Sequence, residues 1–138
     1  GAFYSHFTSK SDLYAQAIVK AAQVAQKRKP TGQPNSIEEF GQYYLTCQHR
    51  DDNLKQACPL AFLVSDITQQ NEQVKTTYTK VLNRFILQAE KHSKSREQAL
   101  QNAVLMIGGL AISRALNDTD FSDELLQACR AGLVSTGI

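Results

Sequence analysis

Apolar residues recur every three or four positions along nearly the whole chain, which is the spacing of helices that bury one face. The clearest run extends from Val74 to Ala89 and predicts a long amphipathic helix; it includes Tyr78, Val81, Leu82, Phe85 and Ile86. No stretch shows the alternation of apolar and polar residues that is typical of a strand. We therefore expect an all-α domain, a bundle of about six helices.

Capping residues and prolines set the limits of the first three predicted helices. Residues 9–29 form the first, which ends before Pro30 because a residue that precedes proline disfavours the helical conformation. The Ser-Ile-Glu-Glu sequence at 36–39 is a capping box and opens a second helix, which should reach about His49. Pro59 suits the first position of a third helix, whose inward-facing residues are Phe62, Leu63 and Ile67.

The last two predicted helices differ in character. Residues 95–98 form a second capping box, and the helix that follows is apolar nearly all round from Ala103 to Leu116. Such a helix has to be covered on several sides. Residues 117–120 break it, and the final helix carries its apolar residues at helical spacing: Phe121, Leu125, Leu126, Cys129 and Leu133.

Length and composition place these helices in one domain. With 138 residues, of which 42% are hydrophobic, the chain is long enough to bury a core without disulfides or a metal. Cys47, Cys58 and Cys129 are widely spaced and form no C-x-x-C pair, so we expect reduced thiols and a cytoplasmic protein. No signal-peptide pattern opens the chain and its longest apolar stretch is half a membrane span, so we expect no membrane partner.

The sequence offers no combination of residues that points to catalysis. It lacks a Gly-rich phosphate loop, a G-x-S-x-G elbow and an H-E-x-x-H helix, and its three histidines lie far apart. We expect His49-Arg50-Asp51 to make local hydrogen bonds and caps. Cys58 lies near a predicted helix N-terminus, where the helix dipole would lower the pKa of its thiol, although we expect it to serve packing. We expect no enzyme, no cofactor and no metal site.

The opening residues carry the most specific motif. Gly1-Ala-Phe-Tyr-Ser-His-Phe-Thr-Ser-Lys10, followed by Leu13, resembles the end of the DNA-binding domain of TetR-family transcriptional regulators. By this resemblance residues 1–12 end a helix-turn-helix domain, and residues 13–138 form the effector-binding and dimerisation domain. Because no Met or capping residue opens the chain, we expect further residues before it. The resemblance implies that the bases lie nearest to Gly1 and Ala2 and that the phosphates are bound by Tyr4, His6 and Lys10.

A second region and the charge distribution agree with this resemblance. Tyr44-Leu45, His49-Arg50-Asp51 and Ala57-Cys58-Pro59 are similar to motifs of a TetR subgroup, with Ala57 in place of the usual Gly. The whole chain has a net charge of +2, but its first thirty residues carry five cations and one carboxylate, a net +4, which leaves −2 for the remainder. A basic N-terminal segment on a mildly acidic bundle is expected if that end of the chain lies next to DNA.

Two sets of residues are candidates for binding sites. One set combines aromatic and apolar residues with a few polar groups, which suits a pocket for a small apolar or aromatic effector. Core packing explains the same set equally well. Its members are Phe40, Tyr43, Tyr44, Cys47, Phe62, Asp66, Tyr78, Phe85 and Met106. The resemblance also implies a homodimer formed by the last two helices. Close packing within one chain is an alternative explanation of the paired glycines, Gly108 and Gly109. The candidate interface residues are Gly108, Gly109, Leu110, Ala111, Leu126, Cys129 and Leu133.

The resemblance implies a function: a ligand-responsive transcriptional repressor that binds operator DNA as a dimer and is released by a small-molecule effector. A helix-turn-helix needs a first helix to orient the second in the major groove, and that helix would precede Gly1. We therefore expect the 138 residues alone to bind operator DNA weakly or not at all. The alternative is a helical protein-interaction or dimerisation module without DNA binding.

Overall fold

The computed structural model describes residues 9–27, 34–46, 50–51 and 58–133. Within these ranges the chain is helical and contains no strand, which confirms the all-α prediction. The helices are α1 (Lys10–Lys27), α2 (Ile37–Tyr44), α4 (Pro59–Phe62), α5 (Val64–Ile67), α6 (Glu72–Glu90), α7 (Arg96–Ala115) and α8 (Thr119–Gly132).

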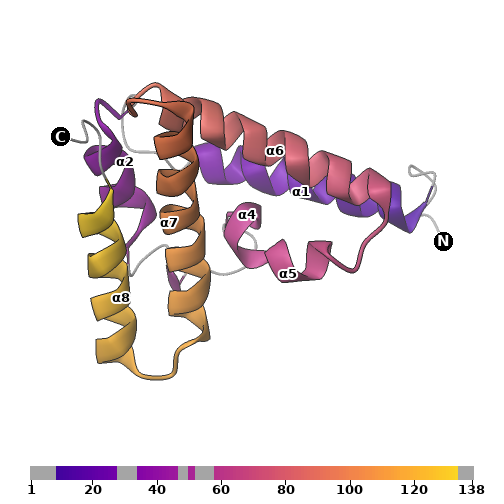
Figure 1. The fold of residues 1–138 in the computed structure, drawn as a ribbon. Helices are drawn as coiled ribbons and strands as arrows, with labels where there is room; N and C mark the ends of the chain where they lie inside the picture. Colours follow the sequence, from indigo (N-terminus) through magenta and orange to yellow (C-terminus); the bar gives the residue numbers. More distant parts are fainter. Residues whose placement is uncertain (1–8, 28–33, 47–49, 52–57, 134–138) are drawn as a thin grey trace.

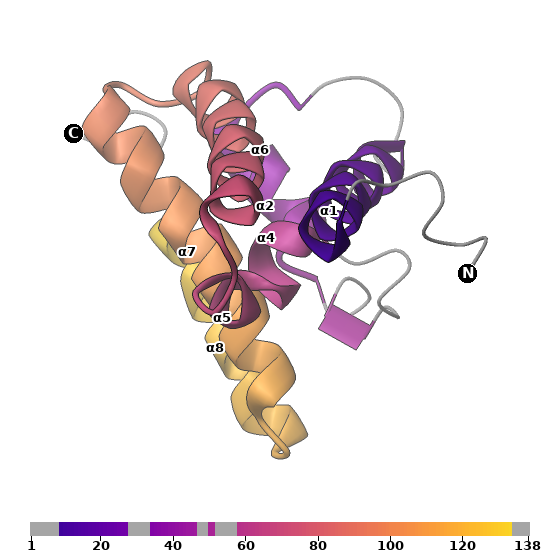
Figure 2. The same ribbon diagram turned by 90° about the vertical axis from the view of Figure 1, so that its right-hand side faces the viewer.

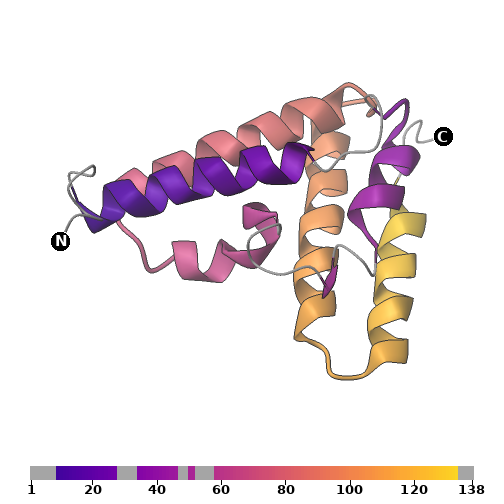
Figure 3. The same ribbon diagram turned by 180° about the vertical axis from the view of Figure 1, so that it is seen from behind.

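The helices form two arms that meet where α6 leads into α7 (Figure 1). In one arm, α1 and α6 lie side by side and run in the same direction, with α4 and α5 along one side of the pair (Figures 1 and 3). In the other arm, α8 runs back along α7, and α2 contacts both. Figure 2 shows α4 and α6 between α1 and the α7–α8 pair, so α1 lies at the outer edge of the molecule.

Side-chain caps begin two helices where the sequence predicted them. The Ser36 hydroxyl accepts a hydrogen bond from the Glu39 amide at 3.0 Å, and the Ser95 hydroxyl accepts one from the Gln98 amide at 3.1 Å. Each bond satisfies one of the amides that have no carbonyl partner in the first helical turn. The capping-box predictions therefore place the starts of α2 and α7 correctly.

The helix α2 is shorter than predicted. It ends at Tyr44 rather than near His49, and residues 47–49 lie outside the described part of the chain. Leu45 leaves the helical conformation, with φ −93° and ψ 66°, while its amide still donates to the Gly41 carbonyl at 2.8 Å. Because the Leu45 side chain is fully buried in the main core, tertiary packing overrides the helical periodicity at this point.

The predicted helix at 59–67 is divided. Leu63, with φ −113° and ψ 0°, separates α4 from α5. The two parts then direct their apolar side chains to different places: Leu60 enters the main core, and Ile67 enters a smaller cluster beneath α1. A continuous helix would have placed both residues along one face.

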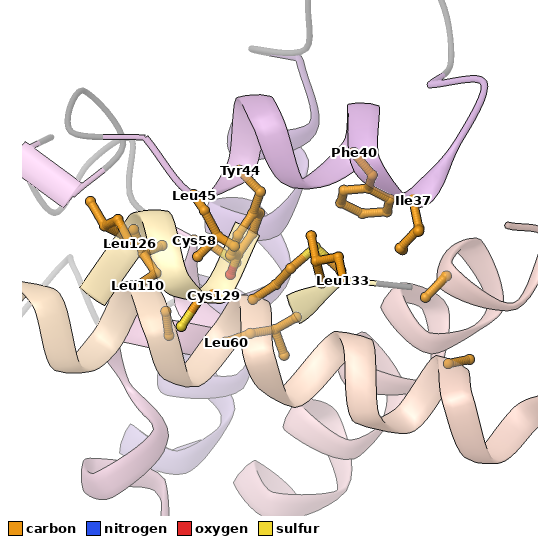
Figure 4. Close-up of a cluster of buried hydrophobic side chains, with 14 residues drawn as sticks. Ile37, Phe40, Tyr44, Leu45, Cys58, Leu60, Leu110, Leu126, Cys129 and Leu133 are labelled. Carbon is orange, nitrogen blue, oxygen red and sulfur yellow. The ribbon is translucent and has the colours of Figure 1, made fainter. Parts of the chain in front are cut away.

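Buried side chains form two clusters. The main cluster joins α2, α4, α6, α7 and α8, and Figure 4 labels its members Ile37, Phe40, Tyr44, Leu45, Cys58, Leu60, Leu110, Leu126, Cys129 and Leu133. A smaller cluster of Ile18, Ile67 and Val74 holds α1 against α5 and α6. Tyr78 and Val81 of α6 pack against both clusters. Contact between α1 and the main core therefore passes through α6 and also through α4, which touches α1 directly.

Candidate functional site

Most of the predicted DNA-contacting residues lie outside the described part of the chain, since the ranges that are described begin at Ser9; these residues are Gly1, Ala2, Tyr4 and His6. Lys10 is the first residue of α1, and its side chain is exposed. The motif therefore ends in the first turn of α1. Its contact with DNA stays a prediction.

Side-chain hydrogen bonds connect the start of α1 with α5 and α6. The Tyr14 hydroxyl donates a hydrogen bond to the carboxylate of Asp66, and the side-chain amide of Gln73 donates one to Asp12 at 3.4 Å. Burial together with Asp66 raises the pKa of Tyr14 to about 12. Asp66 is exposed beside α1. It is therefore separate from the aromatic residues with which the pocket prediction grouped it.

Five of the predicted pocket residues come together where α2, α6 and α7 meet. The ring of Phe40 stacks on that of Tyr43, with centroids 5.5 Å apart and planes 4° from parallel. The rings of Phe85 and Phe40 meet edge to face with their centroids 5.3 Å apart, and the Phe85 centroid lies 5.4 Å from that of Tyr44. Met106 is fully buried in the same cluster. We call Phe40, Tyr43, Tyr44, Phe85 and Met106 the aromatic group.

The tyrosine hydroxyls of this region differ in their partners. Tyr44 donates to the sulfur of Cys58 at 3.3 Å, and Tyr78 donates to the Leu60 carbonyl at 2.6 Å. The hydroxyl of Tyr43 is buried, and within the described ranges it has no hydrogen-bond partner. Burial raises the pKa of Tyr43 to about 12, so this hydroxyl keeps its proton at neutral pH. Tyr43 thus holds a buried donor that the protein itself does not use.

Two further pocket candidates are not part of the aromatic group. The guanidinium of Arg114 lies 3.9 Å from the centroid of the Phe62 ring, a cation–π contact that links α4 with α7. Cys47 lies outside the described residues. Of the nine candidates, the structure brings together the five of the aromatic group and packs Tyr78 and Phe62 against the same core.

Burial raises the pKa of the Cys58 thiol, so the lowering expected from a helix N-terminus is wrong. Loss of hydration outweighs the hydrogen bonds from Tyr44 and from the backbone amides of Leu60 and Ala61, which act in the opposite direction. The helix that follows, α4, has only four residues, and its dipole is correspondingly small. The packing interpretation of Cys58 is the one that the structure supports.

Arg50, from the His-Arg-Asp motif, forms a brace between distant parts of the chain. Its guanidinium donates to Asp51 at 2.9 Å, which is the local hydrogen bond that the sequence predicted. It also reaches α8, where it donates to the Ser122 hydroxyl at 2.9 Å and to the Asp123 carboxylate at 2.6 Å. Arg114 of α7 in turn donates to the Arg50 carbonyl at 2.8 Å. Sequence spacing gave no signal for these contacts across more than sixty residues.

The paired glycines of α7 have different surroundings. A Cβ atom at Gly109 would meet Cys129 and Leu45, whereas a Cβ atom at Gly108 would have nothing within 4 Å. A glycine inside a helix destabilises it by about 1 kcal/mol relative to alanine. Packing inside the chain offsets this effect at Gly109 and leaves Gly108 unexplained.

The predicted dimer residues also differ in how deeply they are buried within the chain. Five of them are buried within the chain itself and have little surface left for a partner: Gly109, Leu110, Leu126, Cys129 and Leu133. Gly108 and Ala111 are half-buried. Large apolar side chains are exposed elsewhere on this helix pair, with exposed fractions of 41% for Leu100, 68% for Val104, 54% for Ile112 and 52% for Phe121. The large exposed side chains of this helix pair are therefore not among the predicted residues, of which Gly108 and Ala111 alone are partly exposed. The dimer itself stays a prediction.

An open groove of about 620 Å³ lies along α1 and α6. Its lining combines apolar side chains with polar ones, and none of the nine predicted pocket residues is among them. The lining residues are Asp12, Leu13, Ala15, Gln16, Ala17, Val19, Lys20, Gln23, Gln73 and Thr77. The groove was not predicted, since it combines residues of α1 with Gln73 and Thr77 of α6, far along the chain.

Compared with models of known protein families and with curated proteins, the chain matches none of them. Among the residues that the structure describes, no three His, Cys, Asp or Glu side chains are arranged to hold a metal ion. In the same part of the chain, no helix is both long and apolar enough to cross a bilayer. Function is therefore inferred from the opening motif and from the contacts above.

Proposed function

We propose that this chain is the effector-binding and dimerisation part of a ligand-responsive transcriptional regulator, a repressor of the TetR type that acts on operator DNA as a homodimer. The observation that carries the proposal is the continuity between the opening motif and the bundle. The motif ends in α1, α1 packs along α6, and Tyr78 and Val81 of α6 also pack against the core that contains the aromatic group.

The aromatic group is the proposed effector site. Flat, apolar walls favour an aromatic or similarly apolar small molecule, and a single buried donor fixes its orientation. The unpartnered hydroxyl of Tyr43 supplies that donor. The effector would therefore carry a hydrogen-bond acceptor, such as a carbonyl or carboxylate oxygen, at one edge of an apolar ring.

The proposed response follows from linkage between the two sites. An effector that binds better to one arrangement of α6 shifts the population toward that arrangement. Because α6 carries residues shared by both buried clusters, the position of α1 would change with it. A shift of α1 changes the spacing of the two DNA-binding heads in a dimer and lowers affinity for a fixed operator.

A thermal-shift screen of small aromatic compounds bearing one acceptor group tests the effector site. Compounds that raise the melting temperature of the unmodified protein should lose their effect in Tyr43→Phe and keep it in Tyr78→Phe. The second variant is the matched control, because its hydroxyl already bonds to the Leu60 carbonyl. Equal shifts in both variants would place the binding site elsewhere.

The alternative function is a helical protein-interaction or dimerisation module without DNA binding. The exposed apolar side chains of α7 and α8 favour it, since contiguous exposed apolar surface is typical of association sites. DNA binding by a form of the protein that carries a complete helix-turn-helix domain ahead of Gly1 distinguishes the two functions.

A further inference from the structure

The groove along α1 and α6 is a place where a third helix can pack. The two helices lie side by side and run in the same direction (Figures 1 and 3), and the open groove of about 620 Å³ has walls from both. Neighbouring helices that run together leave a furrow that can take the side chains of another helix. Ala17 and Val19 of α1 line the groove and are exposed, so an incoming helix can come close.

One face of α6 continues the groove toward the end of that helix. Gln73 and Thr77 line the groove itself. The residues that follow them at alternating steps of three and four share their side of the helix. All of these later residues are exposed, and Leu87 has an exposed fraction of 55%. We call the whole set the α6 stripe: Gln73, Thr77, Lys80, Arg84, Leu87 and Lys91.

The α6 stripe is basic, and its own helix does not neutralise it. Residues 72–96 carry six cations and two carboxylates, a net +4. One of these carboxylates, Glu90, is bound to Arg96 at 2.7 Å. No cation of the stripe forms an ion pair with another residue that the structure describes. Cations four residues apart on a helix, such as Lys80 and Arg84, repel each other, so a partner that brings carboxylates to this face is favoured by charge.

We propose that the groove and the α6 stripe bind an acidic amphipathic helix of a partner protein. The apolar face of that helix lies against Val19 and Leu87, as in other complexes in which a helix occupies a groove. Its carboxylates pair with cations from both walls, which are Lys20 of α1 and the three cations of the stripe. The stripe extends over residues 73–91, so a partner helix of about five turns covers it.

The apolar members of this surface favour a protein helix over nucleic acid. Cations alone would suit the phosphates of a DNA backbone equally well. Val19 and Leu87 would gain nothing from phosphates, because apolar side chains are stabilised by burial against other apolar groups. The carboxylate of Asp12, at the start of the groove, would also repel a phosphate. The inference therefore adds a protein partner to the proposed function and does not depend on it.

Selection from a library of helical peptides tests the proposal with the whole chain as the target. Each peptide has about five helical turns, with alanine and leucine fixed along one face and Asp, Glu, Lys or Arg chosen at random at the flanking positions. The enriched peptides should be acidic. Fluorescence anisotropy should give them micromolar dissociation constants that rise with salt concentration.

Single substitutions locate the binding surface. Lys80→Glu and Arg84→Glu should each weaken binding of the enriched peptides by about tenfold or more, because each reverses a charge of the stripe. Ala17→Trp should do the same by filling the groove. Lys75→Glu is the matched control for Lys80→Glu, because it makes the same change in the same helix and lies on another side of it. Circular dichroism checks that each variant keeps its fold.

Four outcomes would overturn the proposal. The first is enrichment of no peptide, or of peptides without an excess of carboxylates. The second is equal weakening by Lys75→Glu and Lys80→Glu, which would show attraction to overall charge. The third is binding of random duplex DNA at physiological salt that Lys80→Glu abolishes, and the fourth is self-association that the same variant abolishes. None of these measurements uses operator DNA or an effector, so failure of the regulator proposal would leave them unchanged.

Discussion

Gly109 of α7 lies directly against Cys129 of α8. A Cβ atom at position 109 would stand 2.7 Å from the sulfur of Cys129 and 3.1 Å from Cδ2 of Leu45. Carbon atoms in a packed core attract one another best at about 3.5–4.0 Å, so no side chain fits between these helices at their present separation. The glycine thus sets how closely α8 and the end of α2 pack on α7.

Gly109→Ala should destabilise the fold, although alanine is the better helix former. We expect a loss of about 1–3 kcal/mol in the free energy of unfolding, because the new methyl group forces α7 and α8 apart. Urea denaturation followed by circular dichroism measures this loss. The double variant Gly109→Ala with Cys129→Ala should recover part of it, and a double variant whose losses simply add would show that the contact is not the cause.

Arg50→Ala should be costly, because the buried guanidinium bonds to the buried Ser122 hydroxyl and to the carboxylate of Asp123. Its side chain is 10% exposed, and its loss leaves the buried Ser122 and the Asp123 carboxylate without their donor. We expect a loss of about 1.5–3 kcal/mol in the free energy of unfolding. Arg96→Ala is the matched control, since Arg96 is 58% exposed in its ion pair with Glu90 and should lose less than about 1 kcal/mol. Similar losses of unfolding free energy in the two variants would contradict the role of Arg50 as a brace between distant parts of the chain.

Removal of the Tyr43 hydroxyl should stabilise the protein. A buried donor without a partner destabilises a fold by about 1–3 kcal/mol, and Tyr43→Phe removes it while keeping the ring that stacks on Phe40. We expect a gain of about 1 kcal/mol in the free energy of unfolding. Tyr44→Phe should instead lose about 1 kcal/mol, because its hydroxyl donates to Cys58. A loss in Tyr43→Phe would mean that its hydroxyl has a partner in solution.

Alkaline pH should destabilise the fold through its buried tyrosines. Burial raises the pKa of Tyr43 and of Tyr78 from 10.0 to about 12. Below pH 10 both folded and unfolded forms hold these protons; above it the unfolded form loses them first, so stability falls as the pH rises from 10 to 12. The decline in that window should be smaller in the variant Tyr43→Phe with Tyr78→Phe. An unchanged decline would show that other groups cause it.

The sequence predicted helices well and the faces of those helices less well. Ser36 and Ser95 cap the helices that they were expected to cap, because a capping bond is local. By contrast, α7 is apolar nearly all round, so periodicity cannot distinguish its buried Leu110 from its exposed Ile112. That distinction depends on where α8 and Leu45 pack, which is a property of the whole fold.

The candidate site was predictable in composition and not in detail. Residue type selected the nine candidates, and helical spacing placed two of them, Phe40 and Tyr44, on one face, because residues four apart share a helix face. The separation of Asp66 from the aromatic group follows from the division of the predicted helix at Leu63, which no local signal marks. The partners of Arg50 lie on α8, far along the chain, and a sequence pattern carries no such information.

Selection of bound sequences from random duplex DNA tests the regulator proposal most directly. A form of the protein that carries a complete helix-turn-helix domain ahead of Gly1 should enrich one palindromic sequence, with half-sites about one helical turn apart. It should bind that sequence at about 10⁻⁸ M or tighter at physiological salt, while the 138-residue chain should enrich none. Failure of the longer protein to enrich any sequence would contradict the proposal.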